Sequence, residues 1–245
     1  MNIARTVFTF ALLALLGVAA APSCAGPDAG ERDTSTTSPA LSGEVRSVKL
    51  PLPRFEGPLS LEQAIEARRS VREFTDGPLS LDELGQLLWA AQGITSAQGA
   101  RAAPSAGGTY PLEISVAVGR VSGLEPGVYR YRPTGHELAL IASGDSRARL
   151  AEASLNQSSV SDAAADVVIA AVYSRTTEKY GERGVRYVHL EAGHAAQNLC
   201  LQATALGLGA VTVGAFSDSE VSSVMHLADD EQPLYVVPVG RPATP

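Results

Sequence analysis

Three arginines and a serine stand within five residues of one another, and together they could hold a phosphate group. Arg68, Arg69 and Arg72 flank Ser70 in a chain whose formal net charge is -7. Guanidinium groups present a planar fork of donors that matches phosphate oxygens in pairs, and a hydroxyl adds another donor. The same spacing also fits a basic helix end that complements the helix dipole, so spacing alone leaves both interpretations open.

Lys179 and Tyr180 form a second group with possible chemistry, which would be proton transfer. Both side chains titrate near ~10 when unperturbed, so such a role at neutral pH requires burial or a neighbouring charge. The surrounding residues 178–184 are polar, and we predict a loop between a buried strand and a long helix. A solvated loop without catalytic function is the alternative.

The histidines and cysteines do not predict a metal site. His189 and His194 are five residues apart on a predicted helix, whereas zinc-binding pairs on one helix face are usually three or four apart. Cys200 lies among apolar residues and is expected to be a small core residue. Cys24 is the only other cysteine of the sequence, so no intrachain disulfide can form if Cys24 carries lipid.

The N-terminus resembles a bacterial lipoprotein signal. Arg5 precedes an apolar run over residues 7–21, and Ser23-Cys24 follows it. We therefore expect a signal over residues 1–23, lipid on Cys24, and an exported protein anchored to a membrane of a bacterial cell envelope. A secretory signal cut near Ala21 is the alternative. Residues 24–58, rich in Ser, Thr, Pro and Gly, are predicted to be a disordered tether.

The folded domain is predicted to span residues 59–245. The hydrophobic fraction of the whole chain, 45%, supports one core, and the acidic balance of the chain, with a pI near 5.1, argues against nucleic-acid binding. Capping boxes begin at Ser60 and Ser80. Periodicity predicts helices over 61–68, 81–92, 147–155, 187–206 and from 217, and strands over 113–118, 127–131, 137–141, 167–172, 210–214 and 234–239.

Five motifs occur in order and resemble those of the nitroreductase superfamily, in particular the SagB/ThcOx-type dehydrogenases. They are residues 68–74, residues 104–113, residues 186–199, Leu206-Gly207-Leu208-Gly209, and Val213-Gly214-Ala215 with Gly240-Arg241-Pro242. The resemblance covers residues 59–242. It implies an α+β fold in which helices wrap a mainly antiparallel sheet, and a homodimer with FMN at its interface.

The resemblance also assigns roles to individual residues. Arg68, Arg69, Ser70, Arg72 and Arg241 would hold the FMN phosphate and ribityl chain. A small-residue loop would pack near the isoalloxazine, from the same or the partner subunit, and a second backbone segment would lie beside the ring. The loop residues are Pro104, Ser105, Ala106 and Gly107, and the second segment is Val213, Gly214 and Ala215. Lys179-Tyr180 resembles the catalytic pair of the azoline oxidases in this subfamily.

Three functions follow as hypotheses. The first is an FMN-dependent dehydrogenase that passes hydride between a small substrate and flavin N5. The second is a nitro- or quinone reductase that uses NAD(P)H, although Gly207-Leu208-Gly209 lacks the third glycine of a dinucleotide-binding fingerprint. The third is a non-catalytic lipoprotein that retains the fold as a binding module.

Overall fold

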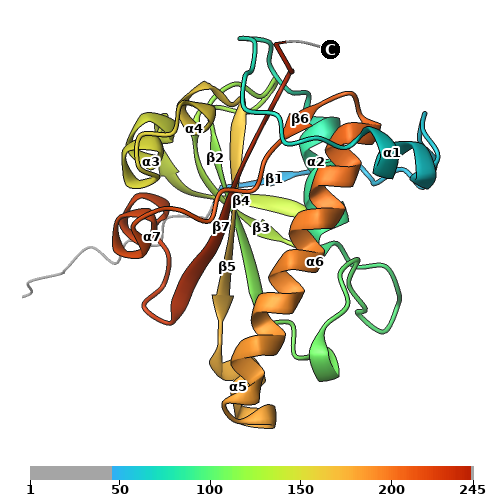
Figure 1. The fold of residues 1–245 in the computed structure, drawn as a ribbon, viewed down its shortest axis with the longest axis vertical. Helices are drawn as coiled ribbons and strands as arrows, with labels where there is room; N and C mark the ends of the chain where they lie inside the picture. The colour runs from blue at the N-terminus through green and yellow to red at the C-terminus, as the bar shows by residue number, and fades with distance from the viewer. Residues whose placement is uncertain (1–45, 244–245) are drawn as a thin grey trace, which may run out of the picture. The chain divides into compact units, whose positions relative to one another are not determined.

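A seven-stranded sheet forms the centre of the molecule (Figure 1). The computed structural model describes residues 46–243. The strand order is β1-β4-β3-β2-β5-β7-β6, and every neighbouring pair is antiparallel. This confirms the predicted α+β class with an antiparallel sheet. The strands are β1 (Ser47–Lys49), β2 (Leu112–Val118), β3 (Gly127–Arg132), β4 (Glu137–Ser143), β5 (Ala165–Val172), β6 (Gly209–Ala210) and β7 (Glu231–Gly240).

Helices cover both faces of the sheet, and each face has its own apolar core. Alternate residues of β5 enter the two cores, with Val167 and Ile169 on one face and Val168 on the other. Helices α2 and α6 pack on the first face, and α3, α4 and α7 on the second. The helices are α1 (Leu61–Ala67), α2 (Leu81–Gln92), η1 (Ala106–Gly108), α3 (Arg147–Ala153), α4 (Ser158–Asp162), α5 (Ser174–Tyr180), α6 (Arg183–Ala205) and α7 (Asp218–Met225).

Several local predictions are confirmed at the level of single residues. Ser60 and Ser80 each accept a hydrogen bond from the third residue of the following helix, and both capping boxes are complete. Helix α2 has the predicted bounds and ends at Gly93. Strand β5 is buried along its whole length, as its continuous apolar run predicts.

The predicted domain boundary at residue 59 is wrong, because the fold includes residues before it. Strand β1 pairs with β4, with Ser47 opposite Ala139, and Leu50 is buried in the first core. Gln86 of α2 accepts a hydrogen bond from the backbone of Arg54. The predicted signal over residues 1–23, Cys24 and the tether up to residue 45 lie outside the described residues. Among residues 46–243, no helix combines the length and the apolar character needed to cross a bilayer.

The segment around Lys179 and Tyr180 is also different from the prediction, which placed both residues in a polar loop. They occupy the last turn of α5, which ends at Gly181 with a positive φ of 57°. Helix α6 begins at Arg183, four residues before the predicted start. Strand β6 has only two residues; beyond Ala210 the chain contacts β7 through a hydrogen bond of 3.4 Å from the N–H of Val211 to the carbonyl of Pro238 and through a bridge between Val213 and Val236.

Candidate functional site

The basic segment, residues 68–72, is held at the β6 edge of the sheet by backbone hydrogen bonds. The N–H of Val71 donates to the carbonyl of Ala210 at 3.0 Å, and Ser70 forms a parallel bridge with Ala210. Just after the segment, the N–H of Thr75 donates to the carbonyl of Arg241 at 2.9 Å. The structure therefore brings the residues just after the predicted phosphate-binding segment 68–72 into contact with Arg241, which lies 169 positions after Arg72.

Two glycines allow this close approach. A Cβ atom on Gly209 would lie 2.5 Å from Cγ1 of Val71, and one on Gly240 would lie 2.9 Å from the ring of Phe74. Val71 is thus turned toward the sheet, and its neighbours Ser70 and Arg72 are exposed on the other side. Their hydroxyl and guanidinium groups can reach a ligand in solution.

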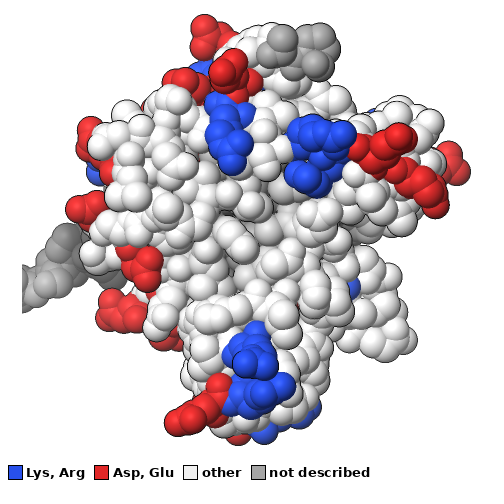
Figure 2. Space-filling model, in the orientation of Figure 1, with Lys and Arg blue, Asp and Glu red and all other residues white. Residues whose placement is uncertain are grey.

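The arginines of the site do not have equal freedom to bind a ligand. The guanidinium of Arg69 donates to the carbonyls of Glu66 and Arg68 at 2.7 and 2.8 Å, and so caps the end of α1. Arg241 donates to the carboxylate of Glu83 at 2.8 Å. Figure 2 shows basic side chains near α1 and β6, with a second basic group over α5. The helix-end interpretation thus describes Arg69, while the exposed Arg72 remains a candidate phosphate ligand.

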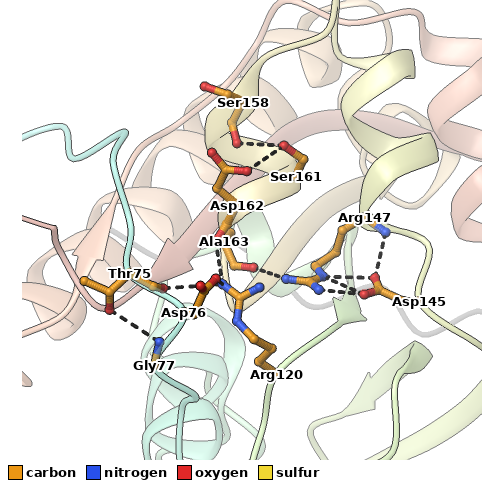
Figure 3. Close-up of polar contacts among 10 residues, drawn as sticks. All are labelled: Thr75, Asp76, Gly77, Arg120, Asp145, Arg147, Ser158, Ser161, Asp162 and Ala163. Atoms are coloured by element: carbon orange, nitrogen blue, oxygen red, sulfur yellow. Dashed lines mark hydrogen bonds and ion pairs between the residues drawn. The ribbon is translucent and has the colours of Figure 1, made fainter.

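The side chain of Arg120 holds the turn that follows the basic segment (Figure 3). The guanidinium of Arg120 donates to the carbonyl of Asp162 at 2.7 Å and to that of Thr75 at 3.4 Å, and it lies 3.9 Å from the carboxylate of Asp76. Arg147 pairs with Asp145 at 2.6 Å in the same region. Arg120 thus connects residues 75–76 to the end of α4, and these contacts limit movement of the basic segment.

The predicted ring-contact segment, Val213-Gly214-Ala215, connects β6 to α7. Val213 exchanges two backbone hydrogen bonds with Val236 of β7, at 2.8 and 3.0 Å. Gly214 and Ala215 are exposed, and the carbonyl of Ala215 accepts a hydrogen bond from Gln157 at 3.1 Å. The first residue is therefore fixed to the sheet, while the next two present their backbone to solvent.

The predicted catalytic pair meets the predicted small-residue loop. The ammonium of Lys179 donates to the carbonyl of Gly107 at 3.2 Å. Gly107 has a φ of 62°, and a Cβ atom at this position would collide with the hydroxyl of Tyr180 and with the Lys179 side chain. The ring of Tyr180 packs edge-on against Tyr187 with centroids 5.2 Å apart. Residues separated by 72 positions in the chain are thus brought into contact.

A buried carboxyl that the sequence prediction missed lies under the same loop. Glu191 of α6 is 2% exposed. Burial raises its pKa to about 7, although a hydrogen bond with Ser105 and the charge of Arg101 act in the opposite direction. Its position was detectable, because Glu191 falls at helical spacing between the apolar Val188 and Ala195. A carboxyl with this pKa can hold or release a proton near neutral pH.

The nearby histidine also has a partner that the sequence did not suggest. The Nε2 atom of His189 lies 2.6 Å from the hydroxyl of Tyr173, and the two rings meet edge to face. Within residues 46–243, no group of three or more potential ligands is arranged to hold a metal ion.

The predicted site falls into two parts on either side of α6. The segment between β6 and α7 passes on one side of this helix, and the loop between α2 and β2 lies on the other (Figure 1). Burial raises the pKa of the Cys200 thiol, near the C-terminal end of α6, and the charge of Arg68 lowers it to a smaller extent. Arg68 therefore lies close to this end of the helix. Lys179 lies just before the N-terminal end. The 23 residues of α6 correspond to about 34 Å.

Comparison with known proteins identifies the fold family. The model of the "Nitroreductase family" matches residues 65–241. The chain is 47% identical over 195 residues to MJ1384 of Methanocaldococcus jannaschii, a protein named as a nitroreductase, and the match covers 80% of this chain and 97% of that protein.

Two solved structures are similar at lower identity. A protein of Ralstonia eutropha, also named as a nitroreductase, has a TM-score of 0.71 at 33% identity and covers 82% of this chain and 91% of its own. A chain of the E. coli microcin synthetase McbBCD complex with truncated pro-MccB17 bound has a TM-score of 0.63 at 25% identity and covers 71% and 68%. The chain therefore belongs to the nitroreductase family, whose members are generally flavin-dependent oxidoreductases.

Proposed function

We propose that the chain is an FMN-dependent oxidoreductase that binds the flavin phosphate through its basic segment. The observation that carries this proposal is the backbone pairing of Val71 with Ala210, which leaves Ser70 and Arg72 exposed near the end of β7, one residue before Arg241. A fixed backbone limits the positions that the outward hydroxyl and guanidinium can adopt, and both groups are donors that match phosphate oxygens. Arg68 would add its charge from the end of α1.

FMN, when bound, supplies the acceptor and donor of hydride, and the chain's own residues supply position and protons. The exposed N–H groups of Gly214 and Ala215 are free to donate to a polar edge of the flavin ring. Lys179 and Tyr180 would hold or move a proton at the ammonium nitrogen and the phenolic oxygen. The Lys179 ammonium is held by the carbonyl of Gly107, and the Tyr180 ring packs against Tyr187. These contacts limit the positions that the two side chains can adopt.

The split of the site across α6 favours a homodimer in which two copies complete each site. The segment between β6 and α7 and the loop that contains residues 104–107 lie on different sides of the helix (Figure 1), so one flavin would meet the first from one chain and the second from its partner. Helix α6 exposes apolar side chains at Val185 (39%) and Leu190 (53%), and α1 exposes Leu61 and Ile65. Covering such side chains is the usual role of an obligate interface.

The substrate class favoured here is that of a SagB/ThcOx-type dehydrogenase, with a small-molecule substrate or electron acceptor. The similarity to a chain of the microcin synthetase complex and the Lys179-Tyr180 pair support it. An NAD(P)H-dependent nitro- or quinone reductase is the second candidate, supported by the relatives that bear the nitroreductase name. A binding module without catalysis is the third.

The absorption spectrum of the purified protein tests the proposal. FMN binding predicts a yellow protein that releases FMN on heating, and a colourless protein that takes up no added FMN would refute it. Anaerobic mixing with NADPH then separates the two enzymatic candidates, because rapid bleaching identifies the reductase. A flavin that is reduced only by another small substrate identifies the dehydrogenase, and a bound flavin that no donor reduces leaves the binding module.

We further propose that Cys24 carries lipid and anchors the protein in the cell envelope. The proposal rests on the Ser23-Cys24 signal, and two or more acyl chains give stable anchoring where one is marginal. Mass spectrometry of the N-terminal peptide from membrane fractions should find modified Cys24 as the first residue. An unmodified Cys24, or a different first residue, would refute the anchor.

A further inference from the structure

A small polar cavity lies between α2, the start of β2 and α5, apart from the basic segment and from the Lys179 side chain. Its volume is about 90 Å³. A cavity of this size has room for about three water-sized groups, since a water molecule occupies about 30 Å³ in the liquid. Its polar walls are formed by Gln92, Arg101, Tyr110, Glu113, Tyr131 and Arg175.

The first observation that points to a ligand in the cavity is the unpaired side-chain amide of Gln92. Gln92 is the last residue of α2 and is 1% exposed. Neither the nitrogen nor the oxygen of its side-chain amide has a hydrogen-bond partner among the described residues. Buried amides are nearly always paired with protein, water or ligand, so this amide requires a partner within the cavity.

Arg101 supplies an uncompensated positive charge. One of its terminal nitrogens donates to the backbone carbonyl of Gln92 at 3.2 Å, and its guanidinium lies 5.1 Å from the centre of the Tyr110 ring. Its Nε atom is buried and has no partner within residues 46–243. The ion pairs of that part of the chain do not include Arg101.

The other charges near the cavity balance one another. Glu113 contacts Arg175 at 2.7 Å and Arg130 at 3.4 Å, and Arg130 pairs with Glu231 at 2.6 Å. Two carboxylates thus face two guanidiniums, and Arg101 remains as the net positive charge. Glu191 also lies near enough to Arg101 for the arginine charge to lower its pKa. Burial has the larger effect and raises that pKa to about 7, so this carboxyl only partly offsets the charge of Arg101 near neutral pH.

Tyr131 does not supply a donor to the cavity. Its hydroxyl lies 2.9 Å from Nδ1 of His136, and Nε2 of the same ring lies 2.9 Å from the carbonyl of Pro51. Because a carbonyl only accepts, Nε2 carries the proton and Nδ1 accepts the proton of Tyr131. The fully buried side-chain donors of the lining that have no partner among the described residues are therefore the amide nitrogen of Gln92 and Nε of Arg101.

We propose that this cavity binds a small carboxylate of the size of formate or acetate. The two unpaired donors match two carboxylate oxygens, and the net positive charge of Arg101 matches the charge of the anion. A water molecule beside the anion can donate to the amide oxygen of Gln92. Its lining includes neither the basic segment nor the Lys179 side chain, so we expect the protein to bind the anion with or without FMN.

Titration of the full-length protein with 13C-labelled sodium formate tests the proposal by NMR line width and by thermal unfolding. For three ligand atoms we expect a dissociation constant of about 1 mM or weaker. Formate should raise the Tm above the value in sodium chloride of the same ionic strength. Equal Tm values in the two salts, with no line broadening, would overturn the proposal.

Matched variants locate the binding. Gln92→Leu and Arg101→Lys should each weaken formate binding at least about tenfold, because each removes one of the two donors. Arg149→Met, which removes an exposed arginine on α3, should leave it unchanged. If Gln92→Leu lowers the Tm in chloride by several degrees and formate binding persists, the amide has an internal partner and the assignment is wrong.

A chain-length series identifies the source of the carboxylate. Binding that ends at acetate indicates a free small anion that fills the cavity. Binding that persists with propionate and butyrate indicates the carboxylate end of a larger molecule, whose chain leaves past the half-exposed Arg175. Binding of butyrate with no binding of formate would contradict a cavity-filling carboxylate site.

Discussion

The two ends of α6 carry different kinds of contact. At the C-terminal end, the basic segment is fixed by its backbone to β6, and exposed side chains extend from a rigid base. At the N-terminal end, Lys179 and Tyr180 reach the loop at Gly107 through their own side chains, with one hydrogen bond of 3.2 Å. The first arrangement suits binding with fixed donors, and the second suits groups that must change their proton. Mutations should therefore separate cofactor binding from chemistry.

The largest effect is expected at the N-terminal end. Lys179→Ala should retain bound FMN and the fold, and it should slow substrate-driven flavin reduction by about 10²–10⁴-fold, the usual range for a general acid or base. Stopped-flow absorbance measures this rate. Reduction by dithionite should be unchanged, because it needs no positioned proton.

Tyr180→Phe isolates the phenolic oxygen, since the ring that packs on Tyr187 is retained. Wild-type reduction rates in both variants would show that the pair is only a structural contact to Gly107. Loss of FMN in either variant would remove the distinction between the two ends of α6.

Glu191 lies between the two ends, and it predicts a pH-dependent stability. Its pKa is about 7 in the folded protein against 4.5 for an unburied glutamate, so the folded state binds the proton more tightly. The free energy of unfolding should therefore fall as pH rises from about 4.5 to 7, by up to roughly 3 kcal/mol. Urea unfolding of wild type and Glu191→Gln at pH 5 and pH 8 measures this term.

The comparison with Glu191→Gln removes other contributions. Burial also raises the pKa of the fully buried Asp166, but this group is present in both proteins and cancels. Glu178→Gln, an exposed change on α5, serves as the control and should leave the profile as in wild type. If the Glu191→Gln profile runs parallel to that of wild type, the Glu191 carboxyl titrates normally.

The smallest effect distinguishes the arginines at the C-terminal end. Arg68→Ala and Arg72→Ala should each lower FMN affinity about tenfold to a hundredfold, since a charge-assisted contact contributes roughly 1.5–3 kcal/mol. Arg69→Ala should lower it less, because that guanidinium is already bonded to the carbonyls of α1. Fluorescence titration with FMN measures all three. Equal losses at the three positions would mean that Arg69 leaves its cap to bind the ligand.

Local signals predicted most of the regular structure. The capping box at Ser80 and the spacing of apolar residues fixed both ends of α2, and the apolar run of β5 identified a central strand. Strand β1 was missed because three residues at a sheet edge have no readable alternation. Helix α5 was missed because its polar sequence resembles a loop, and its helical form depends on packing against α6.

The contacts within the site depended on the fold, and sequence alone could not supply them. The motifs identified the basic segment and the small-residue loop, but the use of Arg69 as a helix cap depends on side-chain direction. The contact of Gly107 with Lys179 depends on how the loop crosses the start of α6. The cavity at Gln92 gave no sequence signal, because a glutamine at a helix end usually lies in solvent.

The strands at the two ends of the sheet also limit how this protein can self-associate. An exposed strand edge is a template for pairing with another chain and for aggregation, and proteins often counter this with very short edge strands. Here β1 has three residues and β6 has two, and the bridge from Ser70 to Ala210 covers part of β6. Extension of the sheet from copy to copy is therefore disfavoured, and in the proposed homodimer the second copy would pack on the exposed apolar side chains of the helices instead.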